Sequence, residues 1–257
     1  MTAAATIFSQ LESKDFEAKL QEIHRNFPNI KLERHIANAL VTSINNTQKK
    51  FVAYSEVEKI DICLYEDQGR ERKEVELKYH FAPDFWRRYK SKSNGQTCEK
   101  WLESEIARYN KKNDKDKNKS DGVVHEVLKD ICRESCDIFI HIIADRHGAD
   151  RSWSKEGRHR LNKKGVPIAF LNDQITLEES AKKEGNALGW TEPLIALWKR
   201  SSERGFNCLQ RKTIHVHKRC DKAPPLWLHF VVLTKEDQPN SNKPKDFFED
   251  LTHWNSA

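Results

Sequence analysis

Hydrophobic and polar residues alternate in two short runs between residues 55 and 79. Every second residue is apolar in the first run, residues 60–64, and again in the second run, residues 75–79. The segment between the two runs contains Gly69. Alternation with a period of two on both sides of a turn is typical of two paired β-strands. The pattern therefore predicts a β-hairpin.

The turn determines which residues of the hairpin face each other. With Gln68 and Gly69 as a two-residue turn, Asp61 lies directly opposite Glu76. A slip of one residue would turn an apolar face to water, because successive side chains of a strand point to opposite faces. This register puts Ile60, Ile62, Leu64, Val75, Leu77 and Tyr79 on a core face, and Asp61, Glu76 and Lys78 on the other.

Two carboxylates in directly opposed positions require compensation. Their Cβ atoms lie roughly 4.5–5.5 Å apart, and like charges at that distance are destabilising. A divalent cation such as Mg²⁺ compensates them, and Lys78 is a second positive group on the same face. An acid pair and a lysine beside such an ion form a typical device for hydrolysing phosphodiesters. The alternative interpretation is an ordinary solvated hairpin face.

The hydrophobic pattern of the other segments predicts an α/β fold. Residues 137–144 are an almost continuous apolar run, which is typical of a central strand buried on both faces. A helix at 123–136 leads directly into this strand, so we expect it to lie parallel to a neighbour. Further helices are expected at 8–27, 31–45, 96–110, 177–185 and 192–204, and further strands at 50–57, 165–171, 213–216 and 226–234.

Asp61, a spacing of fourteen residues and then Glu76-Leu77-Lys78 resemble the motif of the PD-(D/E)xK nuclease superfamily. The chain departs from the motif's name at Ile60, which stands in the place of Pro. The order of one helix followed by three strands is also similar to the opening of that superfamily's core. The resemblance implies a restriction-endonuclease-like core, in which helices flank a mixed β-sheet.

The same resemblance implies roles for individual residues. Asp61, Glu76 and the main-chain carbonyl of Leu77 would hold Mg²⁺, and Lys78 would orient or help to deprotonate the attacking water. Glu33 stands on the apolar face of the helix at 31–45, where an unpaired acid is costly. It is either the partner of a salt bridge at the helix edge or a third acid of the metal site.

Glu58 is an alternative acid for the metal site. In the hairpin register it points to the core-facing side together with Ile60. We therefore rank Glu58 below Asp61.

Charge is clustered rather than large in total. The 257 residues carry a net charge of +6, and residues 86–119 hold 11 Lys or Arg against 5 acids. Residues 146–164 hold seven against two. Both stretches are either solvated charge runs or contacts to a DNA backbone. The expected DNA-binding residues are Arg87, Arg88, Lys90, Lys92, Arg146, His147, Arg151, Arg158 and Arg160.

The composition indicates where the protein works and how it is organised. No run of 18 apolar residues occurs and the N-terminus lacks a basic segment before an apolar one, so we expect a cytoplasmic protein without a membrane span. We expect one domain over 1–257, with a core at about 30–145, basic insertions and an appended C-terminal segment. The six cysteines are expected to be free thiols, and a zinc set of Cys208, His215, His217 and Cys220 is the less favoured alternative.

These observations favour a Mg²⁺-dependent endonuclease that hydrolyses DNA, most similar to a type II restriction endonuclease. Restriction-type recognition would imply a homodimer on a palindromic site. A phage-defence or repair nuclease of the same fold is an alternative, and so is a catalytically inert nucleic-acid-binding protein. A hydrolase with a Ser nucleophile is disfavoured, because the chain contains no GxSxG motif.

Overall fold

The computed structural model describes most of the chain up to Lys235. The described residues are 2–26, 32–47, 50–58, 60–66, 71–81, 88–89, 91–111, 122–133, 135–145, 192–206, 208–217 and 226–235.

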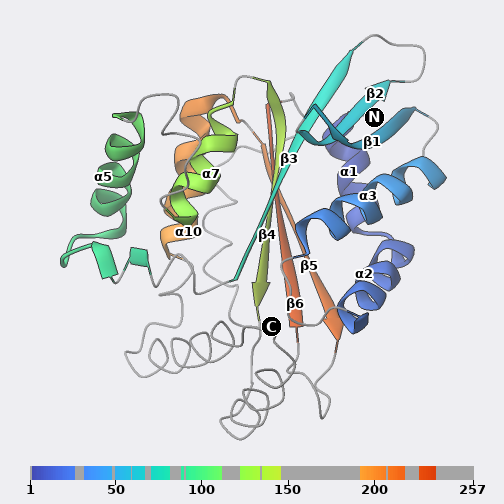
Figure 1. Ribbon diagram of the computed structural model, residues 1–257, viewed down its shortest axis with the longest axis horizontal. Coiled ribbons are helices and arrows are strands. Elements are labelled where there is room, and N and C mark those ends of the chain that lie inside the picture. The colour runs from blue at the N-terminus through green and yellow to red at the C-terminus, as the bar shows by residue number, and fades with distance from the viewer. Residues whose placement is uncertain are drawn as a thin grey trace, which may run out of the picture.

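Six strands form one mixed sheet in the order β1-β2-β3-β4-β6-β5 (Figure 1). β3 and β4 are parallel, and all other neighbouring strands are antiparallel. Because β4 lies between β3 and β6, it is a central strand. The strands are β1 (Phe51–Val57), β2 (Ile60–Glu66), β3 (Arg72–Phe81), β4 (Cys136–Asp145), β5 (Cys208–His217) and β6 (Leu226–Thr234).

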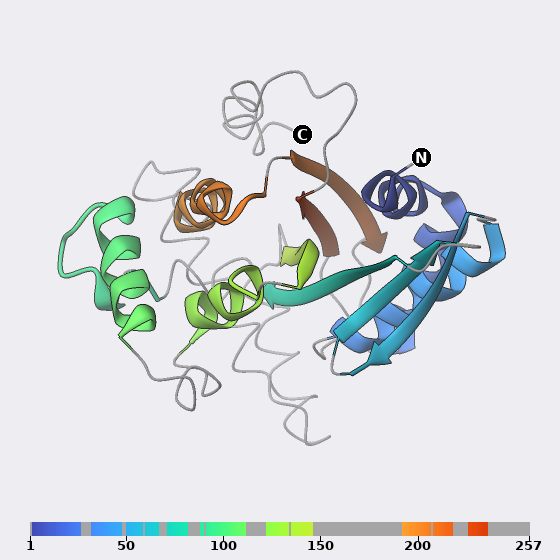
Figure 2. The same cartoon turned by 90° about the horizontal axis from the view of Figure 1, so that it is seen from above.

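Helices cover both faces of the sheet, so the protein is an α/β protein with a mixed sheet between two helical layers (Figures 1 and 2). One layer contains α1 (Ala3–Leu11), α2 (Lys14–Asn26) and α3 (Glu33–Thr47). The other contains α5 (Cys98–Asn110), α7 (Val123–Ile131) and α10 (Glu192–Ser201), which the 3₁₀ turn η1 (Ser202–Arg204) follows. None of the described helices has the length and apolar character needed to cross a lipid bilayer.

Each helical layer buries its own apolar cluster against the sheet. β4 contributes to both clusters, because its side chains alternate between the faces. Ile138, Ile140 and Ile142 pack with α1, α2 and α3, whereas Phe139 and Ile143 pack with α5, α7 and α10. This alternation explains why the β4 sequence is apolar at almost every position.

The structure confirms the predicted hairpin register in the described part of the hairpin. Ile62 pairs with Val75 and Tyr65 with Arg72, as expected for a turn at Gln68 and Gly69, which lie outside the described residues. The six residues expected on the core face are all buried. The predicted parallel arrangement of β4 with a neighbouring strand is also confirmed.

One prediction about a helix is wrong and another is confirmed. The expected helix at 8–27 is two helices, because the Ser13 hydroxyl accepts a hydrogen bond from the Phe16 amide at 3.1 Å and starts α2. The helix expected at 96–110 is α5, which packs beside α7 and α10 in the outer part of the layer on one face of the sheet (Figures 1 and 2). Trp101 and Leu102 of α5 pack into the cluster that these helices share.

The sheet extends beyond the expected core at about 30–145. β5 and β6 add two strands beside β4, and α1 and α2 contribute buried residues such as Ile7 and Phe16. A strand buried on both faces also needs hydrogen-bond partners on both edges, and β6 supplies the second edge. The strand expected at 165–171 and the helix expected at 177–185 lie outside the described residues.

Candidate functional site

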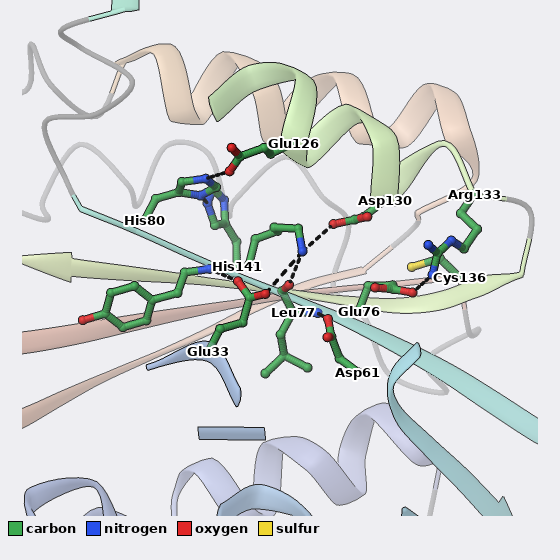
Figure 3. A network of polar contacts seen from close by, with 12 residues as sticks. Glu33, Asp61, Glu76, Leu77, His80, Glu126, Asp130, Arg133, Cys136 and His141 are labelled. Atoms are coloured by element: carbon green, nitrogen blue, oxygen red, sulfur yellow. Dashed lines mark hydrogen bonds and ion pairs between the residues drawn. The ribbon is translucent and has the colours of Figure 1, made fainter. Parts of the chain in front are cut away.

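The site lies where β2 and β3 separate. Their pairing runs as far as Ile62 and Val75, and side chains take over the next hydrogen bonds at that edge of β3. The Asp61 carboxylate accepts a hydrogen bond from the Leu77 amide at 2.7 Å, and the Glu33 carboxylate accepts one from the Tyr79 amide at 2.8 Å (Figure 3). Two acids from β2 and α3 are therefore fixed on one strand edge.

Lys78 lies at the centre of this arrangement. Its ammonium donates to the Leu77 carbonyl at 3.0 Å, and it lies 3.0 Å from a carboxylate oxygen of Asp130 and 3.4 Å from one of Glu33. Burial alone would lower the pKa of Lys78, but the carboxylates of Asp130, Glu33 and Asp61 outweigh it, so the pKa is raised. Lys78 is therefore a charged ammonium at neutral pH.

Asp130 is a buried acid that the sequence reasoning missed. Its side chain is 3% exposed, and it comes from α7, more than fifty residues after the hairpin. Burial raises the pKa of Asp130 to about 6, although Lys78 acts in the opposite direction. The sequence does contain an indication of this site. Asp130 borders the apolar side of α7, which contains Val127 and Ile131, in the same way as Glu33 borders the apolar side of α3.

The carboxylate of Glu76 is turned to Arg133 and not to Lys78. Glu76 lies on the same face of β3 as Lys78, but its carboxylate forms an ion pair with Arg133, directly after α7 (Figure 3). The Glu76 carboxylate is therefore neutralised by Arg133, and its grouping with Asp61 around a metal ion stays a prediction. In the described part of the chain, no three acidic, histidine or cysteine side chains stand together as a ready metal-binding group.

A pattern of three pairs joins β3 to the α7 segment (residues 122–133). Glu76 pairs with Arg133, Lys78 with Asp130, and the His80 ring with the Glu126 carboxylate at 3.0 Å. Alternate residues of a strand share one face, and Glu126 and Asp130, four residues apart, share one face of α7. Arg133 follows just after the end of the helix. The polar face of β3 is therefore matched, position by position, with polar residues from the α7 segment.

The third pair extends into a buried histidine network. The Trp198 indole donates to His141 Nδ1 at 3.0 Å, so the proton of a neutral His141 lies on Nε2. That nitrogen donates to His80 Nδ1 at 2.9 Å, and His80 Nε2 then donates to Glu126. Burial, together with His80 and Lys78, lowers the pKa of His141. The two rings thus tie β3 and β4 to α7 and α10.

The charges of the site do not balance. Lys78 is surrounded by the carboxylates of Glu33, Asp61 and Asp130, whereas Glu76 and Arg133 neutralise each other. Three negative charges against one positive charge leave an excess of two. One divalent cation would neutralise that excess.

Several other predicted site residues have different surroundings from those expected. Glu58 does not point to the core: it lies in the turn after β1 with φ 52°, is exposed, and pairs with Arg72 at 2.8 Å. Arg88 turns inward to the buried Glu105 at 3.4 Å, whereas Lys92 is exposed.

The remaining basic residues expected to bind DNA lie outside the described residues. These are Arg87, Lys90, Arg146, His147, Arg151, Arg158 and Arg160. The side chains of the alternative zinc set, Cys208, His215, His217 and Cys220, are not described either. Cys63 and Cys136 are free thiols, as predicted.

The chain matches no protein-family model, no curated protein and no solved structure in the three comparisons.

Proposed function

We propose that the protein is a Mg²⁺-dependent endonuclease acting on DNA, of the PD-(D/E)xK type and with a restriction-endonuclease-like core. One observation carries the proposal: Asp61 and Glu33 accept the main-chain amides of Leu77 and Tyr79 on one edge of β3, and Lys78 binds Glu33 and the Leu77 carbonyl there. Carboxylates and a lysine gathered on one strand edge have little value for stability alone, because taking them even partly out of water costs free energy. A type II restriction enzyme, a phage-defence nuclease and a repair nuclease all use such a site.

The donor set fits Mg²⁺ in kind. Asp61, Glu76, Glu33 and the Leu77 carbonyl offer oxygen atoms, which this ion prefers, and Mg²⁺ needs only one or two carboxylates beside waters and substrate phosphates. The excess of two negative charges around Lys78 suits a divalent ion. When bound, the ion would polarise the phosphodiester and lower the pKa of a water molecule.

The residues of the chain would then have distinct tasks. Asp61 and Glu76 would hold the ion together with the Leu77 carbonyl, and Glu33 would hold a water of its shell or a second ion. The Lys78 ammonium, fixed by the carboxylates around it, would orient the attacking water and counter the charge that develops on the phosphate. Positive side chains of the basic stretches, Lys92 among them, would bind the DNA backbone.

Incubation with plasmid and phage DNA, with and without Mg²⁺, tests this function. We expect cleavage only with Mg²⁺, and Glu76→Ala and Lys78→Ala should each abolish it while DNA binding persists. Discrete fragments would favour a restriction enzyme, and a smear would favour a nonspecific nuclease. Cleavage by both variants at the rate of the parent would refute the assignment.

The rival function is a nucleic-acid-binding protein without catalysis. The observation that favours it is the ion pair of Glu76 with Arg133, which neutralises a required carboxylate. DNA binding by the parent without cleavage under any divalent ion would support this rival. It would leave the fold unaffected.

A further inference from the structure

The α7 segment places one charged group against each of the two β3 residues that matter most for the proposed site. Asp130 lies against Lys78, and Arg133 lies against Glu76. Resting on the proposed function, we infer that both are positioning residues of the site. Asp130 holds the Lys78 ammonium in place, and Arg133 is the counter-ion that a divalent cation replaces on Glu76.

Asp130 and Lys78 compensate each other's charge. A buried carboxylate is costly unless a partner compensates it, and Asp130 is 3% exposed, with the Lys78 ammonium at 3.0 Å. The same ammonium reaches the Leu77 carbonyl at 3.0 Å. Asp130 therefore pulls the amine from the α7 side while Glu33 and the Leu77 carbonyl bind it from the strand edge. Without the Asp130 charge, the ammonium would be drawn further onto Glu33 and would compete with a metal ion there.

Arg133 compensates the buried charge of Glu76. The Glu76 side chain is 4% exposed and needs a positive partner where it lies, whereas the Arg133 side chain is 30% exposed. Arg133 also lies after the last residue of α7, so its side chain can leave Glu76 without disturbing a helix. An arginine and a divalent ion are then alternative partners for the same carboxylate.

The roles of Asp130 and Arg133 predict opposite changes in the affinity of the site for a divalent ion. Loss of Arg133 removes a competitor for Glu76, so the site should bind a divalent ion more tightly. Loss of the Asp130 charge leaves Lys78 less well neutralised, so the site should bind the ion more weakly. A merely structural role for either residue would weaken binding through loss of the fold, or leave it unchanged.

The experiment is a titration with Mn²⁺ alone, in which free ion is followed by electron paramagnetic resonance. For Arg133→Gln we expect the Kd to fall by about tenfold, because Glu76 no longer has to give up its ion pair before it binds the ion. For Asp130→Asn we expect the Kd to rise by about tenfold. Asp130→Glu should restore the parent value, because it returns the charge.

Two matched controls come from the same elements. Arg72→Gln removes an arginine from another buried β3 glutamate, Glu74, and should leave the Kd near that of the parent. Glu126→Gln removes an acid of α7 that faces His80 instead of Lys78. This variant should also leave the Kd near that of the parent. Thermal unfolding of each variant shows that it is folded. Arg133→Lys, with a shorter reach, serves if Arg133→Gln is not folded, and it should give a smaller change in the same direction.

The outcomes separate the inference from the proposed function. If Arg133→Gln matches Arg72→Gln, or Asp130→Asn matches Glu126→Gln, the inference is overturned, even when Glu76→Gln abolishes Mn²⁺ binding and the proposed site stands. If Asp61→Asn and Glu76→Gln both bind Mn²⁺ as well as the parent, the proposed site itself fails, and the inference fails with it.

Discussion

The two faces of β3 are built on different principles. On one face Val75, Leu77 and Tyr79 are buried in an apolar cluster with α1, α2 and α3. On the other face Glu76, Lys78 and His80 each have a polar or charged partner in the α7 segment. The first face contributes stability by removing apolar surface from water, whereas the second holds charges whose burial is costly. A costly arrangement on a central strand indicates function.

Two neighbouring residues on opposite faces provide the sharpest contrast. If the proposed function holds, Lys78→Met should reduce Mg²⁺-dependent DNA cleavage by about 10²–10⁴-fold, because it removes the ammonium proposed to orient the water, while DNA binding persists. Initial rates under single-turnover conditions measure the effect. A variant that still cuts within a few-fold of the parent would show that the polar face has no catalytic task.

Leu77→Ala on the apolar face should act on stability instead. Leu77 is completely buried, so the truncation should lower the free energy of unfolding by about 2–5 kcal/mol. Urea unfolding measures this loss. Below the unfolding transition the variant should cleave DNA nearly as well as the parent, since its main-chain carbonyl is retained. A large loss of cleavage in fully folded Leu77→Ala would mean that the two faces are not separable.

Asp130 makes the stability depend on pH. Its pKa is raised from an ordinary 3.8 to about 6 in the folded state, so the folded protein binds this proton more tightly than the unfolded chain does. The resulting stabilisation is complete below pH 3.8 and is lost as the pH rises through 6, a change of about 3 kcal/mol. Asp130→Asn lacks this proton equilibrium. The stability of the parent relative to Asp130→Asn should therefore fall between pH 4 and pH 7, and a constant difference would contradict the burial of this carboxylate.

The smallest effect on stability is expected for an ion pair that lies on neither face of β3. Arg34 and Glu56 lie 2.7 Å apart, but their side chains are 71% and 51% exposed. Such a pair contributes little, so Arg34→Ala should change the free energy of unfolding by less than about 0.5 kcal/mol. Chemical denaturation of the variant checks this. A loss as large as that of Leu77→Ala would mean that exposed charges matter here as much as the core.

The same contrast explains what could be predicted from the sequence. The apolar face of β3 and the register of the hairpin follow from alternation alone, because one slip would expose the whole face. The central position of β4 follows from its continuous apolar run. The motif also predicts one group of Asp61, Glu76 and Lys78, but it gives no sign that Glu76 has Arg133 as its partner.

The partners of the polar face could not be read from local patterns. Asp130 and Arg133 reach β3 only because the chain crosses over and brings α7 beside it. The alternation of residues in the hairpin does not indicate these contacts. The break between α1 and α2 was missed for a related reason. The apolar rhythm continues through Ser13, and only the hydrogen bond of its hydroxyl marks the new helix start.

The most direct test is a crystal structure with Mn²⁺, located by its anomalous scattering. The account predicts a Mn²⁺ ion bound by the Asp61 carboxylate and the Leu77 carbonyl, with Glu76 turned from Arg133 to the ion and Lys78 still beside Asp130. An ion bound elsewhere in crystals of a chain that cleaves DNA, with Glu76 still paired to Arg133, would contradict it.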